Sequence, residues 1–286
     1  MLEVCDMERQ AMFRALIGAV AALAVTGALA KTCVWTPKGD PYSWSHAECW
    51  DQMPEDGDDV VINNAGVSAG FGTIFSFGGT TTPALKSLTF RCPSVASAWN
   101  FQNGTLVFQK ANPTINLSES GKNQIRLVIG NNFKFRTDDA DGTQINLAVN
   151  NPGEIQFQQE QDLLLMLTGS NGAVLRVKQD TALGPVPANV VSNQIVLTGA
   201  SLGLDGYSKV DVELAATRGI EIRDGSNCNL HADNGNLTIN GPVWGDGSVQ
   251  IVRTSGTVTL NGKCSYTGDT RLGVGSGGET YCRVVL

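Results

Sequence analysis

The sequence predicts an all-β protein built as a parallel β-helix, a fold in which the chain coils into stacked rungs of parallel strands. From about residue 85 onward, short segments of alternating apolar and polar residues recur roughly every 8 to 12 residues. Gly, Asn, Asp and Ser separate these segments, and no helical pattern follows residue 30. The inward positions are aliphatic and similar in size, as stacking of like residues in successive rungs requires. A β-sandwich has the same strand spacing and stays open as the alternative.

Residues 1–30 have the features of an export signal. Arg9 and Arg14 precede an uncharged run over 15–30, which ends in the small-x-small sequence Ala28-Leu29-Ala30. This run is short for a membrane-spanning helix of roughly 20 residues, although an uncleaved anchor is the alternative. We therefore expect cleavage after residue 30 and no membrane span in the mature chain.

Residues 31–84 form a Trp-rich segment that differs from the rest of the chain. Trp35, Trp44 and Trp50 are followed by an acidic stretch over 55–59. Large aromatic side chains at the start of a β-helix can cover the open edge of its first rung. We expect a capping segment here, and an exposed sugar-stacking platform is the alternative.

Residues 85–286 carry the predicted β-helix. Strands are expected at 106–108, 115–117, 125–129, 133–135, 145–149, 155–157, 163–167, 174–177, 195–197, 210–214, 220–222, 237–239 and 258–260. The pairs Asn131-Asn132, Asn150-Asn151, Asn171-Gly172 and Asn234-Gly235 are expected in turns, because these residues accept backbone conformations that β-branched residues avoid. At roughly 20 to 25 residues per rung, the mature chain forms about ten rungs.

Composition and charge exclude two classes of protein. With 42% hydrophobic and 16% charged residues, the chain is too apolar to be intrinsically disordered. Its net charge of −7 and its lack of a Lys/Arg cluster argue against binding to nucleic acid.

Six cysteines remain after Cys5 leaves with the signal. They are Cys33, Cys49, Cys92, Cys228, Cys264 and Cys282. An even number in an exported chain predicts disulfides, and local spacing favours Cys33–Cys49 and Cys264–Cys282, although 15 pairings are open. No Cys-x-x-Cys pair exists, so zinc binding is not expected.

Residues from about 241 to 270 carry a repeat-like motif. They contain a glycine-rich turn, a Gly-Thr-Val-Thr-Leu strand and a Tyr-Thr-Gly-x-Thr segment, with motif positions Gly245, Gly247, Gly256, Thr257, Leu260, Gly262, Tyr266, Thr267, Gly268 and Thr270. This pattern resembles the autotransporter-associated β-strand repeat, although Cys264 stands where that repeat usually has Asn. The resemblance implies a right-handed β-helical passenger displayed outside a bacterial cell as an adhesin or matrix component.

Several patterns suggest chemistry without the context that it needs. Gly66–Gly70 matches a nucleophile motif, Gly273–Gly278 a dinucleotide fingerprint, and the Asp clusters at 56–59 and 138–142 offer oxygen ligands, but the helices or spacings that these sites require are missing. His46 and His231 are the only histidines. We predict no catalytic, cofactor-binding or metal-binding residues.

The alternative of a polysaccharide-acting enzyme needs carboxylates clustered on one face of the β-helix. Its candidate residues are Asp205, Asp211, Glu213, Arg218, Glu221, Arg223 and Asp224.

The sequence thus favours an exported, non-catalytic structural or adhesive protein. We expect it outside the cell or at the outer cell surface, with the periplasm as a further compartment, and we expect surface or matrix polymers, glycans among them, as partners. A carbohydrate-binding module and a self-associating filament subunit are further alternatives.

Overall fold

The computed structural model describes residues 30–38, 42–63, 73–91, 97–109, 113–117, 125–138, 143–204, 209–253 and 256–273. The chain divides into two compact units, residues 1–30 and residues 31–286. All but the last residue of the predicted export signal lies outside the described residues, as do Cys5, Cys92 and Cys282. Every element named below belongs to the second unit.

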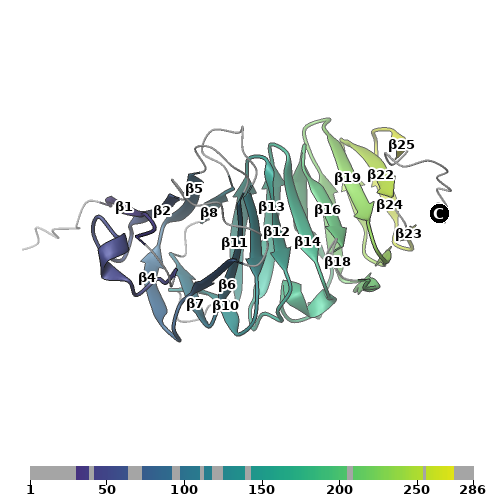
Figure 1. Ribbon diagram of the computed structural model, residues 1–286. Helices are drawn as coiled ribbons and strands as arrows, with labels where there is room; N and C mark the ends of the chain where they lie inside the picture. The colour runs from purple at the N-terminus through teal and green to yellow at the C-terminus, as the bar shows by residue number, and fades with distance from the viewer. Residues whose placement is uncertain are drawn as a thin grey trace, which may run out of the picture. The chain divides into compact units, whose positions relative to one another are not determined.

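The second unit is a parallel β-helix, as the sequence predicts (Figure 1). Sheet A has ten strands: β1 (Thr32–Trp35), β2 (Asp59–Asn63), β5 (Ser87–Arg91), β8 (Thr114–Asn116), β11 (Gln144–Asn150), β13 (Leu164–Ser170), β15 (Val191–Thr198), β18 (Arg218–Ile222), β21 (Val243–Gly245) and β24 (Cys264–Tyr266). Sheet B has nine: β3 (Thr73–Ser76), β6 (Ser97–Gln102), β9 (Ile125–Ile129), β12 (Gly153–Phe157), β14 (Ala173–Val177), β16 (Ser201–Leu204), β19 (Asn227–Ala232), β22 (Ser248–Arg253) and β25 (Thr270–Gly273).

Two short sheets and two 3₁₀ turns complete the coils. Sheet C contains β4 (Thr81–Leu85), β7 (Gly104–Phe108) and β10 (Phe133–Thr137), and sheet D contains β17 (Val212–Leu214), β20 (Asn236–Ile239) and β23 (Thr257–Leu260). The 3₁₀ turns are η1 (Ala47–Cys49) and η2 (Asp180–Leu183). Neighbouring strands of each sheet run parallel, which excludes the β-sandwich, and the ten strands of sheet A match the predicted ten rungs.

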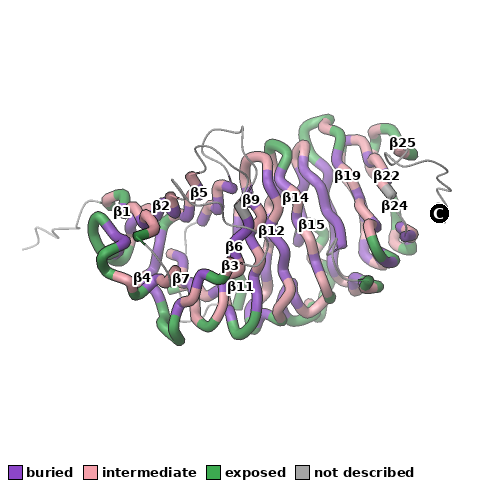
Figure 2. Tube along the Cα trace, viewed as in Figure 1, coloured by how far each residue is buried: buried purple, intermediate pink, exposed green. Residues whose placement is uncertain are grey.

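The interior is filled mainly by alternate residues of the strands, and Figure 2 shows how buried and less buried positions follow one another along the chain. In β11, Ile145 and Val149 point inward, and Ile145 pairs with Leu165 of the next coil. The last coils are filled by aliphatic residues, as expected, whereas the first coils are filled by interlocked aromatic rings. Phe101 lies 5.1 to 6.0 Å, centroid to centroid, from four other phenylalanine rings. Offset and edge-on ring pairs of this kind add stabilisation beyond the burial of their area.

Three of the four predicted turn pairs contain a residue with positive φ, whereas Asn234-Gly235 forms a bend without one. Asn132, Asn151 and Asn171 all have positive φ angles, between 53° and 71°. At the ends of strands in sheet A, Asn116, Asn150 and Asn171 form a hydrogen-bonded ladder in which Asn150 Oδ1 accepts from Asn171 Nδ2 at 2.6 Å. Asparagine therefore serves both the turn geometry and the connection between coils.

The last coils repeat with a period of 21 residues, as the hydrogen bond from Asn261 to Asn240 shows. The motif glycines stack in this register. A Cβ atom at Gly256 would lie 1.6 Å from the carbonyl oxygen of Gly235, and one at Gly262 would lie 1.9 Å from that of Gly241. Only glycine fits such close backbone contacts, so the glycines of the motif are explained by the packing of successive coils.

The Trp-rich segment is part of the β-helix and also covers its first edge. Its residues contribute β1 to β4, and a return segment after η1 pairs antiparallel with β1 through Trp35 and Trp50. The outer edge of β1 is thereby occupied. Trp35, Trp44 and Trp50 are buried, at 0%, 3% and 6% exposure, so the alternative of a sugar-stacking platform formed by these residues is wrong.

The predicted disulfide between Cys33 and Cys49 is absent. The antiparallel pairing places Cys49 beside Thr36, whose N–H donates to the Cys49 carbonyl at 2.7 Å. Cys33 is three residues further along β1, a distance of about 10 Å that is too long for a disulfide. Cys33 Sγ instead donates to Asp58 Oδ2 at 3.3 Å, and Cys49 Sγ lies 3.8 Å from His46 Nδ1. The disulfide predicted from local spacing is wrong because the chain reverses direction between the two cysteines.

Asp58 connects the first two coils from a buried position. Its carboxylate accepts hydrogen bonds from the backbone N–H groups of Lys31 and Glu55, at 3.0 and 2.8 Å. Burial raises the pKa of this carboxyl, but the hydrogen bonds outweigh burial and the net pKa is lowered. Burial and the adjacent carboxylate raise the pKa of the Cys33 thiol to about 12.

We expect Asp58→Asn to lower the free energy of unfolding by about 1–3 kcal/mol at pH 7, because the amide cannot replace every bond that the carboxylate accepts. A folded-state pKa below the unfolded value means that the carboxylate stabilises the fold above pH 3.8 and loses this effect as the pH falls through the folded-state pKa. The difference between wild type and variant should therefore shrink in acid. Urea unfolding between pH 7 and pH 2.5 measures it, with Glu55→Gln at a 70% exposed side chain as control. A difference that is constant with pH would contradict the assignment.

Candidate functional site

The outer face of sheet A carries two neighbouring hollows. One, of about 490 Å³, is lined by residues of β18, β21 and β24 and of the turns that follow β18 and β21. The other, of about 460 Å³, is lined by residues of β11, β13 and β15. Arg223 borders both hollows. We call the two hollows together the sheet A groove.

The groove follows a column of outward side chains in register across six strands. The column contains Ala148, Thr168, Val196, Glu221, Trp244 and Ser265, one from each successive strand. Adjacent strands lie about 4.8 Å apart, so side chains repeat at this interval along the groove. Such a face suits an extended ligand better than a compact one.

Trp244 is the large aromatic residue of the groove. Its indole Nε1 donates to the carbonyl oxygen of Ser192 at 2.7 Å, which brings the ring back across β18 to β15. Gly219 of β18 leaves room there, since a Cβ at this position would lie 2.2 Å from the same carbonyl oxygen. The side chain is partly exposed. The indole is thus held in one orientation while it remains accessible from solution.

The charged groups of the groove are arranged around Arg223. Its Nε and Nη2 donate to the two carboxylate oxygens of Glu221, each at 2.8 Å. These hydrogen bonds raise the pKa of Arg223. Asp224, at a φ of 61°, lies two residues after β18, and Asp246 comes directly after β21. Asp246 Oδ1 accepts from the N–H of Gly225 at 3.3 Å. The carboxylates of Glu221, Asp224 and Asp246 thus outnumber the single guanidinium.

The structure separates the charged residues that the sequence grouped as candidates for catalysis. Glu221, Arg223 and Asp224 line the same hollow. Arg218 is completely buried, where it pairs with Asp180 and donates to the Gly184 carbonyl. Asp211 and Glu213 belong to the sheet D side, where they accept from Asn236 and Asn240. Asp205 lies outside the described residues, as do Gly66–Gly70 and all of the 138–142 cluster except Asp138.

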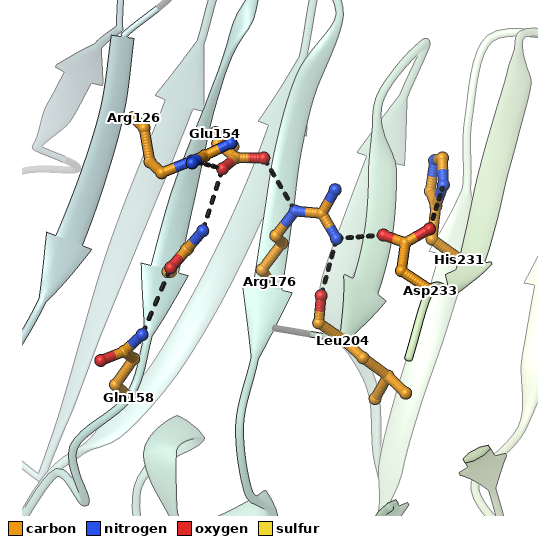
Figure 3. Close-up of polar contacts among 8 residues, drawn as sticks. Arg126, Glu154, Gln158, Arg176, Leu204, His231 and Asp233 are labelled. Carbon is orange, nitrogen blue, oxygen red and sulfur yellow. Dashed lines mark hydrogen bonds and ion pairs between the residues drawn. The ribbon is translucent and has the colours of Figure 1, made fainter. Parts of the chain in front are cut away.

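A second group of charges crosses the outer face of sheet B (Figure 3). Glu154 of β12 accepts from Arg126 of β9 through Oε1 and from Arg176 of β14 through Oε2, the latter at 2.8 Å. Arg176 also donates to Asp233, which lies 3.9 Å from the ring of His231. We call these five residues the sheet B ion-pair chain. They belong to four coils, those of β9, β12, β14 and β19, and the chain of contacts passes over a fifth, that of β16.

The ion-pair chain depends on a glycine in the coil that it crosses. Gly203 lies in register with both Arg176 and His231, and a Cβ there would be 2.8 Å from the Cβ of His231. Without a side chain at this position, the Arg176 guanidinium reaches Leu204 O at 2.7 Å and then Asp233. Burial is the main cause that lowers the pKa of His231. The arginines and carboxylates here pair with one another, so the arrangement connects one coil to another.

The other site residues fall within the coils. Cys228 is buried and its thiol donates to Leu197 O at 3.4 Å, whereas Cys264 is exposed. Its predicted partner Cys282 is outside the described residues, so that pairing stays a prediction. The motif positions lie in β21, β23, β24 and β25 and in the turns between them. Tyr266 Oη and Thr270 Oγ1 are 2.6 Å apart.

Sequence reasoning missed Trp244 as a surface residue and the ion-pair chain as a unit. Trp244 stands within the glycine-rich motif, and the sequence offers an exposed aromatic platform only as the alternative role of the N-terminal tryptophans. Its position two residues before Asp246, on a strand where Val243 fills the core, was the available signal. The members of the ion-pair chain are more than 100 residues apart at their extremes, and no local pattern connects them.

Comparisons with models of protein families, with curated proteins and with solved structures gave no match. Within the described ranges no helix is long and apolar enough to cross a membrane. The same residues contain no group of three or more His, Cys, Asp or Glu side chains placed to hold a metal ion. The fold places the chain in the class of parallel β-helix proteins. The sheet A groove is the surface feature from which we infer a function.

Proposed function

We propose that this chain is an exported, non-catalytic protein of the bacterial surface or extracellular matrix, with a structural and adhesive role. The observation that carries the proposal is the ten-strand sheet A, whose outer face presents one side chain per coil at a regular interval. Repetition of this kind suits attachment to a repeating polymer. The predicted export signal at residues 1–30 and the resemblance of residues 241–270 to passenger repeats support the same assignment.

Rigidity is the second property that favours a structural role. The asparagine ladder and the sheet B ion-pair chain link coils that are far apart in sequence. Each coil of a solenoid contacts mainly its neighbours. Side-chain links across several coils therefore distribute a mechanical force among them. The covered edge of β1 argues against a filament that grows by strand addition at this end.

Expression of the full chain in a bacterial host tests this proposal. We expect a secreted product that begins at Lys31, appears as short rods in negative-stain images and is retained on cell-surface or matrix polymers without releasing soluble fragments. A product that stays in the cytoplasm, or compact particles that retain no polymer, would refute the proposal.

A polysaccharide-acting enzyme is the second candidate, because Glu221, Asp224 and Asp246 line one hollow. Paired carboxylates on a polysaccharide-binding face are the usual arrangement for glycoside hydrolysis. Both carboxylate oxygens of Glu221 accept hydrogen bonds from Arg223, so this side chain is engaged within the protein. Release of reducing ends or unsaturated products from polysaccharides, abolished by Glu221→Gln, would establish catalysis and remove the first proposal.

A further inference from the structure

We propose that the sheet A groove binds a linear polysaccharide of amino sugars through protonated amino groups. This inference rests on the proposed adhesive function and specifies its ligand. It follows from three properties of the groove: its shape, its fixed aromatic ring and its charge.

The shape of the groove fits a linear chain that lies across the strands. The residues of the column from Ala148 to Ser265 pair in register from one strand to the next. The hollows on either side of Arg223 have similar volumes. Side chains such as Asn146, Met166 and Thr168 give the second hollow a mixed polar and apolar lining without a charge of their own. A polymer could therefore place uncharged sugar faces there and ionic groups nearer Trp244.

The orientation of Trp244 favours a cation. Tryptophan has the most attractive ring face for an ammonium group, within about 6 Å of the ring centroid. The hydrogen bond to Ser192 holds the indole before any ligand arrives, so little side-chain entropy is lost on binding. The ring also offers an apolar surface for the carbon skeleton of a sugar.

The charge of the groove selects the same ligand and rejects acidic ones. Glu221 neutralises Arg223, which leaves the exposed carboxylates of Asp224 and Asp246 beside Trp244. The whole chain also carries a net charge of −7. A polyuronate would be repelled, whereas an ammonium group would pair with the two carboxylates and pack against the indole face.

The test compares three oligosaccharides by titration calorimetry at pH 6: a fully deacetylated glucosamine hexamer, its N-acetylated counterpart and an oligogalacturonate of equal length. We expect the deacetylated hexamer to bind at least about tenfold more tightly than the other two, with weaker binding at high salt. Equal affinities, a preference for either other probe, or no binding would overturn the inference. Secretion, rod shape and polymer retention are measured separately, so a failure here leaves the proposed function standing.

Variants locate the binding to the groove. Trp244→Ala should weaken binding of the deacetylated hexamer about tenfold, Trp244→Phe should restore part of it, and Asp224→Asn with Asp246→Asn should remove the salt dependence. Asparagine tolerates the positive φ at position 224, so this change should preserve the turn. Glu160→Gln, which removes one negative charge at an exposed position after β12, is the control for each aspartate change. Unchanged binding in correctly folded Trp244→Phe and Asp224→Asn/Asp246→Asn proteins would overturn the assignment.

Discussion

Arg218→Met is expected to lower the free energy of unfolding by about 3–5 kcal/mol, the usual effect of removing one partner of a buried ion pair. The Arg218 side chain is completely buried, and its Nε donates to Asp180 Oδ1 at 2.8 Å. Its Nη2 donates to the carbonyl of Gly184 at 2.7 Å. Methionine fills a similar volume, but it removes the donor of this carbonyl and the positive charge beside the Asp180 carboxylate, which keeps only the hydrogen bond from the Ala215 N–H. Urea unfolding at pH 7 measures the change.

A double-mutant cycle separates the ion pair from the loss of volume. Arg218→Met combined with Asp180→Asn should cost less than the sum of the two single variants, because the second change removes the uncompensated charge. Arg271→Met is the matched control, since Arg271 forms the same type of pair with Asp269 at an exposed surface. It should change stability by less than about 0.5 kcal/mol. A similarly small effect of Arg218→Met would show that the buried pair does not hold these coils together.

Phe101→Ala should destabilise the first coils by about 3–5 kcal/mol, because it leaves a cavity among rings that hold one another in place. Phe101 is 1% exposed and contacts Phe75, Phe77, Phe90 and Phe133. In a solenoid the damage should spread mainly to neighbouring coils. Hydrogen exchange should therefore lose protection in β3, β6 and β9 and keep it in β20 and β23.

Ile74→Ala is the control for this experiment. Ile74 lies on neighbouring β3 but is 48% exposed, so its truncation should cost less than about 0.5 kcal/mol. Uniform loss of protection over all coils in Phe101→Ala would instead indicate that the whole β-helix unfolds as one cooperative unit.

The class of fold could be predicted from local sequence. Alternation such as Ile145-Asn146-Leu147 predicts which side chains point inward, and asparagine or glycine after each segment predicts where the chain turns. These signals are local, because a strand and its turn are formed by adjacent residues. They indicated the parallel β-helix and its ten rungs, and the strand pairing confirms both.

The groove and the ion-pair chain could not be predicted in the same way. Glu221 and Arg218 were equally good candidates in sequence, yet Glu221 lines a hollow whereas Arg218 is completely enclosed. Coils vary in length, from 20 residues between Gln144 and Leu164 to 34 between Thr114 and Ala148, so no fixed period indicates which side chains become neighbours. The register between strands decides which side chains become neighbours, and the packing of whole coils sets that register.

The amino-acid sequence by itself determined the β-helix, the inward face of its strands and the residues of its turns, because each depends on neighbours along the chain. Only the tertiary structure decided that Cys33 and Cys49 lie apart, that the N-terminal tryptophans are interior, and that Trp244 meets Glu221 on an open face. These outcomes depend on which coil lies beside which, and on how far the chain travels before it returns to the same sheet. Contacts between coils are long-range, so they appear only when the stack has formed.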